Sequence, residues 1–267
     1  MNLFVIIILG IVQGITEFLP VSSSGHVLVI SRLLQSASSF EFDVLVSFGT
    51  LFAVIIYYRK RFVEIFLDIY TRRDIGLAAK LIVATIPVAI VGLLFDSIIE
   101  LYLHGTLTAI AMLLIVGLIM VVSASWKPKK QLGANTNLHK ITYKQSILIG
   151  VAQCFSLISG SSRSGVTMLA ALRLGFEKKT AAEWSFLMSV PAIGGASLKV
   201  LLSSEGRDFI TTETTAFVVA NVVSFVFGLA AIHVLLKILQ RKGLYWFGWY
   251  RIILAAVLIV LLSVKIL

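Results

Sequence analysis

The chain has 267 residues, of which 58% are hydrophobic and only 13% are charged, and its formal net charge is +10. Because soluble domains carry about 25% charged residues, this composition excludes an ordinary soluble enzyme and predicts an integral membrane protein. The positive charge does not indicate nucleic-acid binding, because the Lys and Arg residues stand in short loops between apolar runs, where they orient membrane proteins. The single cysteine, Cys154, excludes an intramolecular disulfide.

The first apolar region, residues 3–31, is interrupted by a polar segment at 13–26 that reads Gln-Gly-Ile-Thr-Glu-Phe-Leu-Pro-Val-Ser-Ser-Ser-Gly-His. No Lys or Arg precedes the region, so it lacks the start of a cleaved signal and we expect it to stay in the mature chain. Pro20 should end a helix, and the serines after it should open another. Glu17 is the only acid of the region, and a carboxylate at membrane depth is costly unless it has a function.

Gln13 lies four residues before Glu17, so the two share a face of the predicted helix. Such a pair can bind a hydrated divalent cation, Mg²⁺ or Ca²⁺, or the glutamine can orient the carboxylate. The plain alternative is a neutral, hydrogen-bonded glutamic acid.

The turn Ser22-Ser23-Ser24-Gly25 can present backbone N–H groups and hydroxyls to an anion. Its alternative role is helix capping alone. His26 could attack phosphorus, orient an attacking group or move a proton, although an isolated histidine in apolar sequence is more often a hydrogen-bonded core residue.

Six further apolar runs have the length of membrane-spanning helices, so the fold class is all-α. They are at about 43–58, 77–95, 107–126, 183–204, 216–239 and 249–267. Cations gather in loops 59–80 and 127–144, in segment 173–180 and near the last turn, where Lys237, Arg241, Lys242 and Arg251 stand. Loops 96–106 and 205–215 are nearly without them, so the positive-inside rule places the first group in the cytoplasm and these loops outside. The aromatic run 245–250 is expected to form an interfacial belt on the cytoplasmic side.

A second polar segment interrupts the apolar region 145–176, and its residues 153–165 read Gln-Cys-Phe-Ser-Leu-Ile-Ser-Gly-Ser-Ser-Arg-Ser-Gly. It repeats the first at an offset of 140, which aligns Gln13 with Gln153, Ser22 with Ser162, Ser24 with Ser164 and Gly25 with Gly165. Arg163 is added here, and a guanidinium can hold a phosphate through two parallel hydrogen bonds. Glu17 instead aligns with Leu157, so the carboxylate is present in one half only, and we interpret Gln153 as structural.

Both neighbours of 145–176 are predicted to be cytoplasmic, so this region should be a re-entrant hairpin turning near Ser159-Gly160. By the same repeat, 3–31 is a hairpin with the N-terminus outside. Each half then holds one hairpin and three spans, and an odd number of spans makes the halves, 1–127 and 141–267, inverted repeats within a single membrane domain. The two hairpin tips are expected to meet near the midplane.

Together the two tips offer a general acid or base, a nucleophile, hydroxyl donors and a cation for developing phosphoryl charge. The substrate class is a phosphate or diphosphate on an amphiphilic lipid. A transporter or flippase of a phosphorylated lipid is the alternative, since inverted repeats suit alternating access. A channel is disfavoured because the polar residues cluster at two tips rather than along several spans.

The segment 13–26 resembles the first signature of the bacterial undecaprenyl-diphosphatases, the BacA-type bacitracin-resistance family, and Ser162–Thr167 resembles the second. The resemblance covers essentially the whole chain. It implies hydrolysis of the C55 polyprenyl diphosphate to the monophosphate, which recycles the lipid carrier for peptidoglycan. It also implies the bacterial cytoplasmic membrane, an active site facing the outer side, and dependence on Mg²⁺ or Ca²⁺.

The resemblance implies that Glu17 and Gln13 form the acidic, metal-binding motif and that Ser23 or His26 attacks, or that His26 helps. The positions expected to bind the diphosphate with Arg163 are Ser22, Ser24, Gly25, Ser162, Ser164, Gly165 and Thr167. Two positions depart from the family pattern, Gln13 where Glu is frequent and Ser159 where Pro is usual. The oligomeric state is left open, a homodimer being one option.

Overall fold

The computed structural model describes residues 2–36, 39–126 and 137–264. Four predictions fall partly outside the described residues. They concern the loop cations Lys127, Lys129 and Lys130, the repeat boundary at 127, part of the outer loop 32–42 and the end of the last predicted span. The α-helices are α1 (Leu3–Phe18), α2 (Ser23–Leu33), α3 (Phe40–Leu45), α4 (Ser47–Tyr57), α5 (Arg59–Thr71), α6 (Gly76–Leu94), α7 (Asp96–Leu103), α8 (Thr106–Ser123), α9 (Tyr143–Cys154), α10 (Arg163–Arg173), α11 (Lys178–Leu202), α12 (Ser204–Thr212), α13 (Thr214–Lys242) and α14 (Tyr245–Ser263). Two short 3-10 helices, η1 (Leu138–Lys140) and η2 (Phe155–Leu157), accompany them.

Within these described ranges, six helical segments are long and apolar enough to cross a membrane, as the sequence predicts. They are Phe40–Tyr57, Gly76–Leu94, Thr106–Ser123, Lys178–Leu202, Thr214–Arg241 and Tyr245–Ser263. The first combines α3 and α4, which adjoin at Val46. The protein is therefore an all-α, multi-pass membrane protein.

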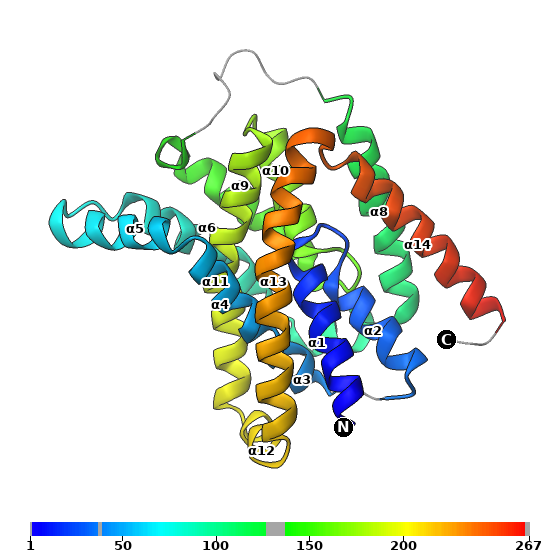
Figure 1. Ribbon diagram of the computed structural model, residues 1–267. Helices are drawn as coiled ribbons and strands as arrows, with labels where there is room; N and C mark the ends of the chain where they lie inside the picture. The colour runs from blue at the N-terminus through cyan, green and yellow to red at the C-terminus, as the bar shows by residue number, and fades with distance from the viewer. Residues whose placement is uncertain (1, 37–38, 127–136, 265–267) are drawn as a thin grey trace.

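The interrupted regions form two helical hairpins, α1–α2 and α9–α10, whose turns face each other inside the bundle (Figure 1). Each hairpin packs on a long helix of the other half, α1 on α13 and α9 on α6. Glycines allow these close approaches, because a methyl group at Gly150 would overlap the carbonyl oxygen of Ala84, and one at Gly10 would lie 2.9 Å from that of Ala220. This exchange of helices fits two related halves, and their inversion stays a prediction.

Three predicted loops are wrong in part, because each contains a helix. Loop 59–80 contains α5, loop 96–106 contains all of α7, and loop 205–215 contains most of α12. These helices are short and carry charges, so they show no long apolar run. In Figure 1, α5 extends sideways from the bundle, while α12 and the α13–α14 junction mark its opposite ends.

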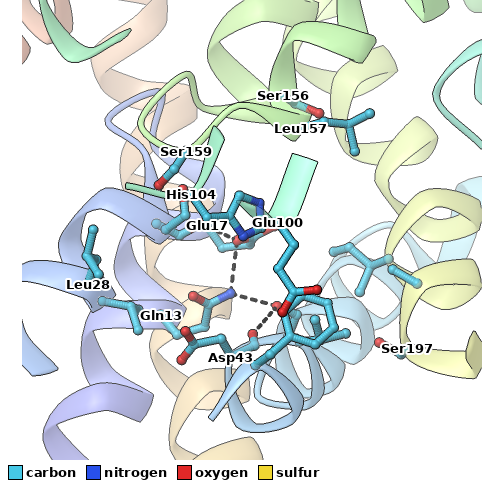
Figure 2. Close-up of a pocket in the computed structure, with 18 residues that line it drawn as sticks. Gln13, Glu17, Leu28, Asp43, Glu100, His104, Ser156, Leu157, Ser159 and Ser197 are labelled. Carbon is cyan, nitrogen blue, oxygen red and sulfur yellow. Dashed lines mark hydrogen bonds between the residues drawn. The ribbon is translucent and has the colours of Figure 1, made fainter. Parts of the chain in front are cut away.

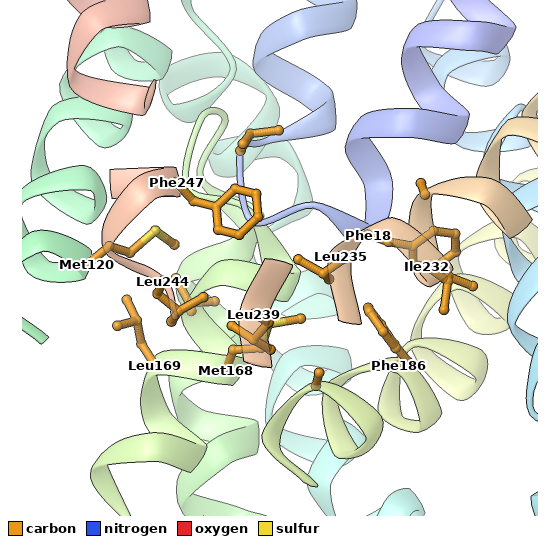
Figure 3. Packing of buried hydrophobic residues seen from close by; sticks show 14 of the residues in the cluster. Phe18, Met120, Met168, Leu169, Phe186, Ile232, Leu235, Leu239, Leu244 and Phe247 are labelled. Atoms are coloured by element: carbon orange, nitrogen blue, oxygen red, sulfur yellow. The ribbon is translucent and has the colours of Figure 1, made fainter. Parts of the chain in front are cut away.

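The largest cluster of buried apolar side chains among the described residues packs against the first hairpin turn (Figure 3). Phe18 at the end of α1 meets Phe186 of α11 edge to face, with ring centroids 5.4 Å apart. Between membrane helices such packing, rather than removal from water, is the main source of stability. Since Phe18 follows Glu17, this contact fixes the end of α1 on which the carboxylate stands.

Candidate active site

The two serine turns have the same local structure. Ser22 and Ser162 each stand directly before a helix, and their backbone φ angles are positive, 78° and 70°. The Oγ of each serine accepts a hydrogen bond from the backbone N–H three residues later, at 3.3 and 3.2 Å. In each turn this serine also lies 3.2 Å, Oγ to Oγ, from the serine two positions later. A non-glycine residue at positive φ costs about 1–3 kcal/mol, and such strain tends to occur at functional sites. Ser22 and Ser162 thus cap their helices, and Gly25 and Gly165 supply the capped N–H groups.

The tips meet, as predicted. The backbone N–H of Gly160 donates to Ser24 Oγ at 3.4 Å, and Ser164 Oγ donates to the carbonyl of Leu19 at 3.2 Å. Residues 136 and 145 positions apart in sequence are therefore brought together in one site.

Glu17 is at the centre of this site. Its Oε1 pairs with Arg163 Nη2 at 2.5 Å, and its Oε2 accepts from Ser23 Oγ at 2.7 Å and from Gln13 Nε2 at 2.9 Å. The Glu17 and Arg163 side chains are only 11% and 14% exposed, so each charge relies on the other. Gln13 also donates to Ser47 Oγ at 2.8 Å, which holds its amide toward the carboxylate.

A cavity of about 450 Å³ opens beside Glu17 (Figure 2). Gln13 and Ser23 line it from the first hairpin, and Glu100 and His104 line it from the segment around α7. An adjoining cavity of about 490 Å³ shares Glu17, Ser23 and Ser24 and adds a largely apolar wall from α6 and α11. The side chains of that wall include Val88, Leu93, Pro191, Ala192 and Ile193. The two cavities thus combine polar groups with a wall that suits a hydrocarbon.

The second terminal nitrogen of Arg163, Nη1, is available to a ligand. This nitrogen is buried and has no partner in the described part of the chain, and the same is true of both side-chain polar atoms of Gln153. Both residues line the second cavity together with Ser162. Buried polar groups are nearly always hydrogen-bonded, so an unpaired guanidinium nitrogen beside a cavity indicates a place for a ligand's oxygen.

His26 is held on the other side of the turn. Its Nδ1 lies 2.7 Å from the carbonyl oxygen of Ser22 and its Nε2 lies 2.7 Å from the Tyr250 hydroxyl. Since a carbonyl only accepts, Nδ1 carries the proton, and in the neutral ring Nε2 accepts from Tyr250. His26 is not among the described residues that line either cavity.

The other predicted binding residues divide into two groups. Ser24 and Ser162 line the cavities, whereas Thr167 is buried and bonds to the Arg163 carbonyl at 2.8 Å and to Ser185 Oγ at 2.7 Å. Like Ser164 and the two capped glycines, Thr167 supports the turns. These residues hold Arg163 in place.

Arg251, which the sequence places among the cations near the last turn, lies inside the bundle. Arg251 is fully buried in α14, and its guanidinium donates to four carbonyl oxygens. These belong to Pro20 (3.3 Å), Met112 (3.1 Å), Gly160 (2.6 Å) and Ser161 (3.2 Å). Arg251 therefore joins both hairpin turns to α8. The signal for it in the sequence is an arginine just inside a predicted span.

The described residues contain no cluster of three or more His, Cys, Asp or Glu close enough to hold a metal by themselves. The first cavity nevertheless offers oxygen atoms from Gln13, Glu17, Asp43 and Glu100. Mg²⁺ keeps several waters and is often held by one or two carboxylates plus substrate phosphates, so this donor set fits a cation that arrives with a diphosphate.

A family model described as bacitracin resistance protein BacA matches residues 6–257. The chain belongs to this family. It is 38% identical to the undecaprenyl-diphosphatase of Geotalea daltonii, over 98% of this chain and 99% of that protein. It is also 34% identical to the undecaprenyl-diphosphatase of Enterococcus faecalis (97% and 96% covered) and 36% identical to that of Methanococcus aeolicus (97% and 98% covered).

Proposed function

We propose that this protein hydrolyses undecaprenyl diphosphate to undecaprenyl phosphate and inorganic phosphate. The observation that carries the proposal is the convergence of Ser23, Glu17 and the unpaired Nη1 of Arg163 on a cavity with an apolar wall. The names of the similar proteins support this substrate, because their similarity to this protein covers nearly the whole chain, including both turns.

Ser23 is the attacking group in this proposal. Its hydroxyl already donates to Glu17 Oε2 at 2.7 Å, so the carboxylate can take the proton as the Ser23 oxygen bonds to the terminal phosphorus. The bond from that phosphorus to the bridging oxygen breaks, and undecaprenyl phosphate leaves. Water then attacks the phosphoserine with Glu17 as base, which releases inorganic phosphate and restores Ser23. His26 is assigned an orienting role, because its Nε2 is occupied by Tyr250.

Arg163 binds the phosphoryl oxygens through Nη1 while Nη2 stays with Glu17. A guanidinium in a site with little water stabilises the charge that develops on the transferring phosphoryl group. When bound, Mg²⁺ or Ca²⁺ would neutralise the diphosphate further, with Gln13, Glu17 and Asp43 as its protein oxygens.

The location and cellular role follow from charge and family. The cavity lining includes Ala196 and Lys199 of α11, close to α12, whereas the cations Lys237 and Arg241 stand beside the α13–α14 junction at the opposite end of the bundle (Figure 1). With the cation-rich end in the cytoplasm, the site faces the outer side of the bacterial cytoplasmic membrane. Hydrolysis there recycles the carrier for peptidoglycan and confers resistance to bacitracin. Lipid transport is not proposed, because the pairing of Glu17 with Ser23 serves hydrolysis and a carrier does not require it.

The test is phosphate release from C55 diphosphate by the purified protein in detergent, with Mg²⁺ or with EDTA. Glu17→Gln should lower kcat by about 10²–10⁴-fold, since the general base is lost. Glu205→Gln, which changes an exposed glutamate of α12, is the matched control and should retain activity. Absence of release from folded wild-type protein with either metal would overturn the proposal.

A further inference from the structure

A third cavity, of about 910 Å³, lies near the end of the bundle where α13 meets α14. Its apolar lining comes from Ile15, Leu19, Val21, Ile238 and Phe247. The cavity touches α1 at Ile15, on the helix face opposite Gln13 and Glu17. One of its lining residues is Tyr250, whose hydroxyl contacts His26. The proposed reaction does not use it.

The polar lining of this cavity is cationic. Lys237 and Arg241 stand one helical turn apart on α13, and Gln240 lies beside them. Neither cation forms an ion pair or hydrogen bond within the described residues, and the described lining contains no Asp or Glu. Like charges four residues apart repel each other, so a bound anion would stabilise the pair.

The two sides of the first hairpin therefore differ in charge. The first active-site cavity contains Glu17, Asp43 and Glu100, so an anionic substrate needs a divalent cation there. The third cavity offers two free cations and an amide instead. A phosphate monoester carries about −1.5 to −2 charges at neutral pH, which matches two cations, whereas a phosphodiester carries one.

We propose that this cavity is a second binding site, and that its ligand is a lipid phosphate monoester. The phosphate binds Lys237 and Arg241 without a metal ion, and the beginning of the hydrocarbon tail lies along Ile238 and Phe247. Trp246 and Tyr250 line the same space and suit the unsaturated units of a prenyl chain. This is the chemical class of the lipid product of the proposed reaction.

The test is native mass spectrometry of the purified protein with farnesyl monophosphate in EDTA. An Arg163→Ala background removes the outer phosphate site, and one bound molecule is still expected. Adding Lys237→Gln and Arg241→Gln should weaken this binding at least tenfold. Lys140→Gln with Lys144→Gln, which removes one exposed cation in η1 and one in the first turn of α9, is the matched control and should leave it unchanged.

Equal weakening by the control pair, or equal binding of phosphatidylglycerol or inorganic phosphate, would overturn the proposal. If Arg163→Ala does not fold, the wild type is titrated instead, and the EDTA-resistant molecule is the one that must depend on Lys237 and Arg241. Ile238→Trp fills the cavity without a change of charge and should also displace the lipid. Retention of the lipid in both folded variants would exclude this site.

Discussion

Arg251 Nη2 donates to the carbonyl oxygen of Gly160 at 2.6 Å, which ties the last helix to the turn that carries Arg163. The same side chain reaches Pro20 in the first turn, so one cation holds both turns in register. Only glycine fits at position 160, because its φ is +88° and a side chain there would overlap the backbone of Ala109. The ion pair between Glu17 and Arg163 therefore depends on a residue that contacts neither of their side chains.

Arg251→Met is expected to destabilise the protein and to lower kcat. Each buried carbonyl left without a donor costs about 1–3 kcal/mol, and those of Pro20, Gly160 and Ser161 lose theirs. Arg251→Lys keeps part of the bonding and should fall between the mutant and the wild type. The midpoint of thermal unfolding in detergent and the rate of phosphate release measure the two effects. A methionine variant with wild-type stability would contradict the positioning role.

Ser23→Ala is expected to lower kcat by at least about 10²-fold, because the hydroxyl bonded to Glu17 is the proposed attacking group. Ser24→Ala is the matched comparison, since its hydroxyl contacts Ser22 and the N–H of Gly160 instead and its loss should cost less. Rapid acid quenching followed by peptide mass spectrometry should find phosphate on Ser23 in the wild type. Unchanged turnover in Ser23→Ala would make water the attacking group.

The turns could be predicted from the sequence because their signals are local. Pro20, the serines and the glycines determine a helix end, a cap and a new helix within a few residues, and the 140-residue repeat brings the second copy to the first. Their meeting followed from the count of crossings. The pairing of Glu17 with Arg163 is not determined by the sequence, because no local signal or repeat relates the two residues.

The sequence could not predict contacts between residues that are far apart in the chain and do not belong to the repeated segments. Tyr250 lies 224 positions from His26, and Arg251 lies 231 positions from Pro20. The aromatic run predicted only an interfacial belt, yet Phe247 is buried and Tyr250 bonds to the first hairpin. No sequence motif marks Glu100 as a site residue, because a charged residue in a predicted loop is common. Only the packing of helices shows which such residues point inward.

Gln13→Glu is expected to lower the Mg²⁺ concentration required for half-maximal activity by a few-fold. The change places a second carboxylate beside Glu17, and Mg²⁺ prefers charged oxygen ligands. It also removes the amide that donates to Glu17 and Ser47, so kcat without saturating metal should fall. A titration of phosphate release against Mg²⁺ in both proteins measures the shift. An unchanged requirement would place the cation away from Gln13.

Gly150→Ala is expected to destabilise the protein strongly, because the new methyl group would overlap the carbonyl oxygen of Ala84 where α9 packs on α6. The backbone must separate there, and overpacking of this kind costs about 1–3 kcal/mol or more. Gly195→Ala in α11 is the matched control, since its methyl group meets nothing within 4 Å. It should be neutral or stabilise by up to about 1 kcal/mol through helix propensity. Thermal unfolding of both variants in the same detergent measures the difference, and equal midpoints would contradict the close packing of α9 on α6.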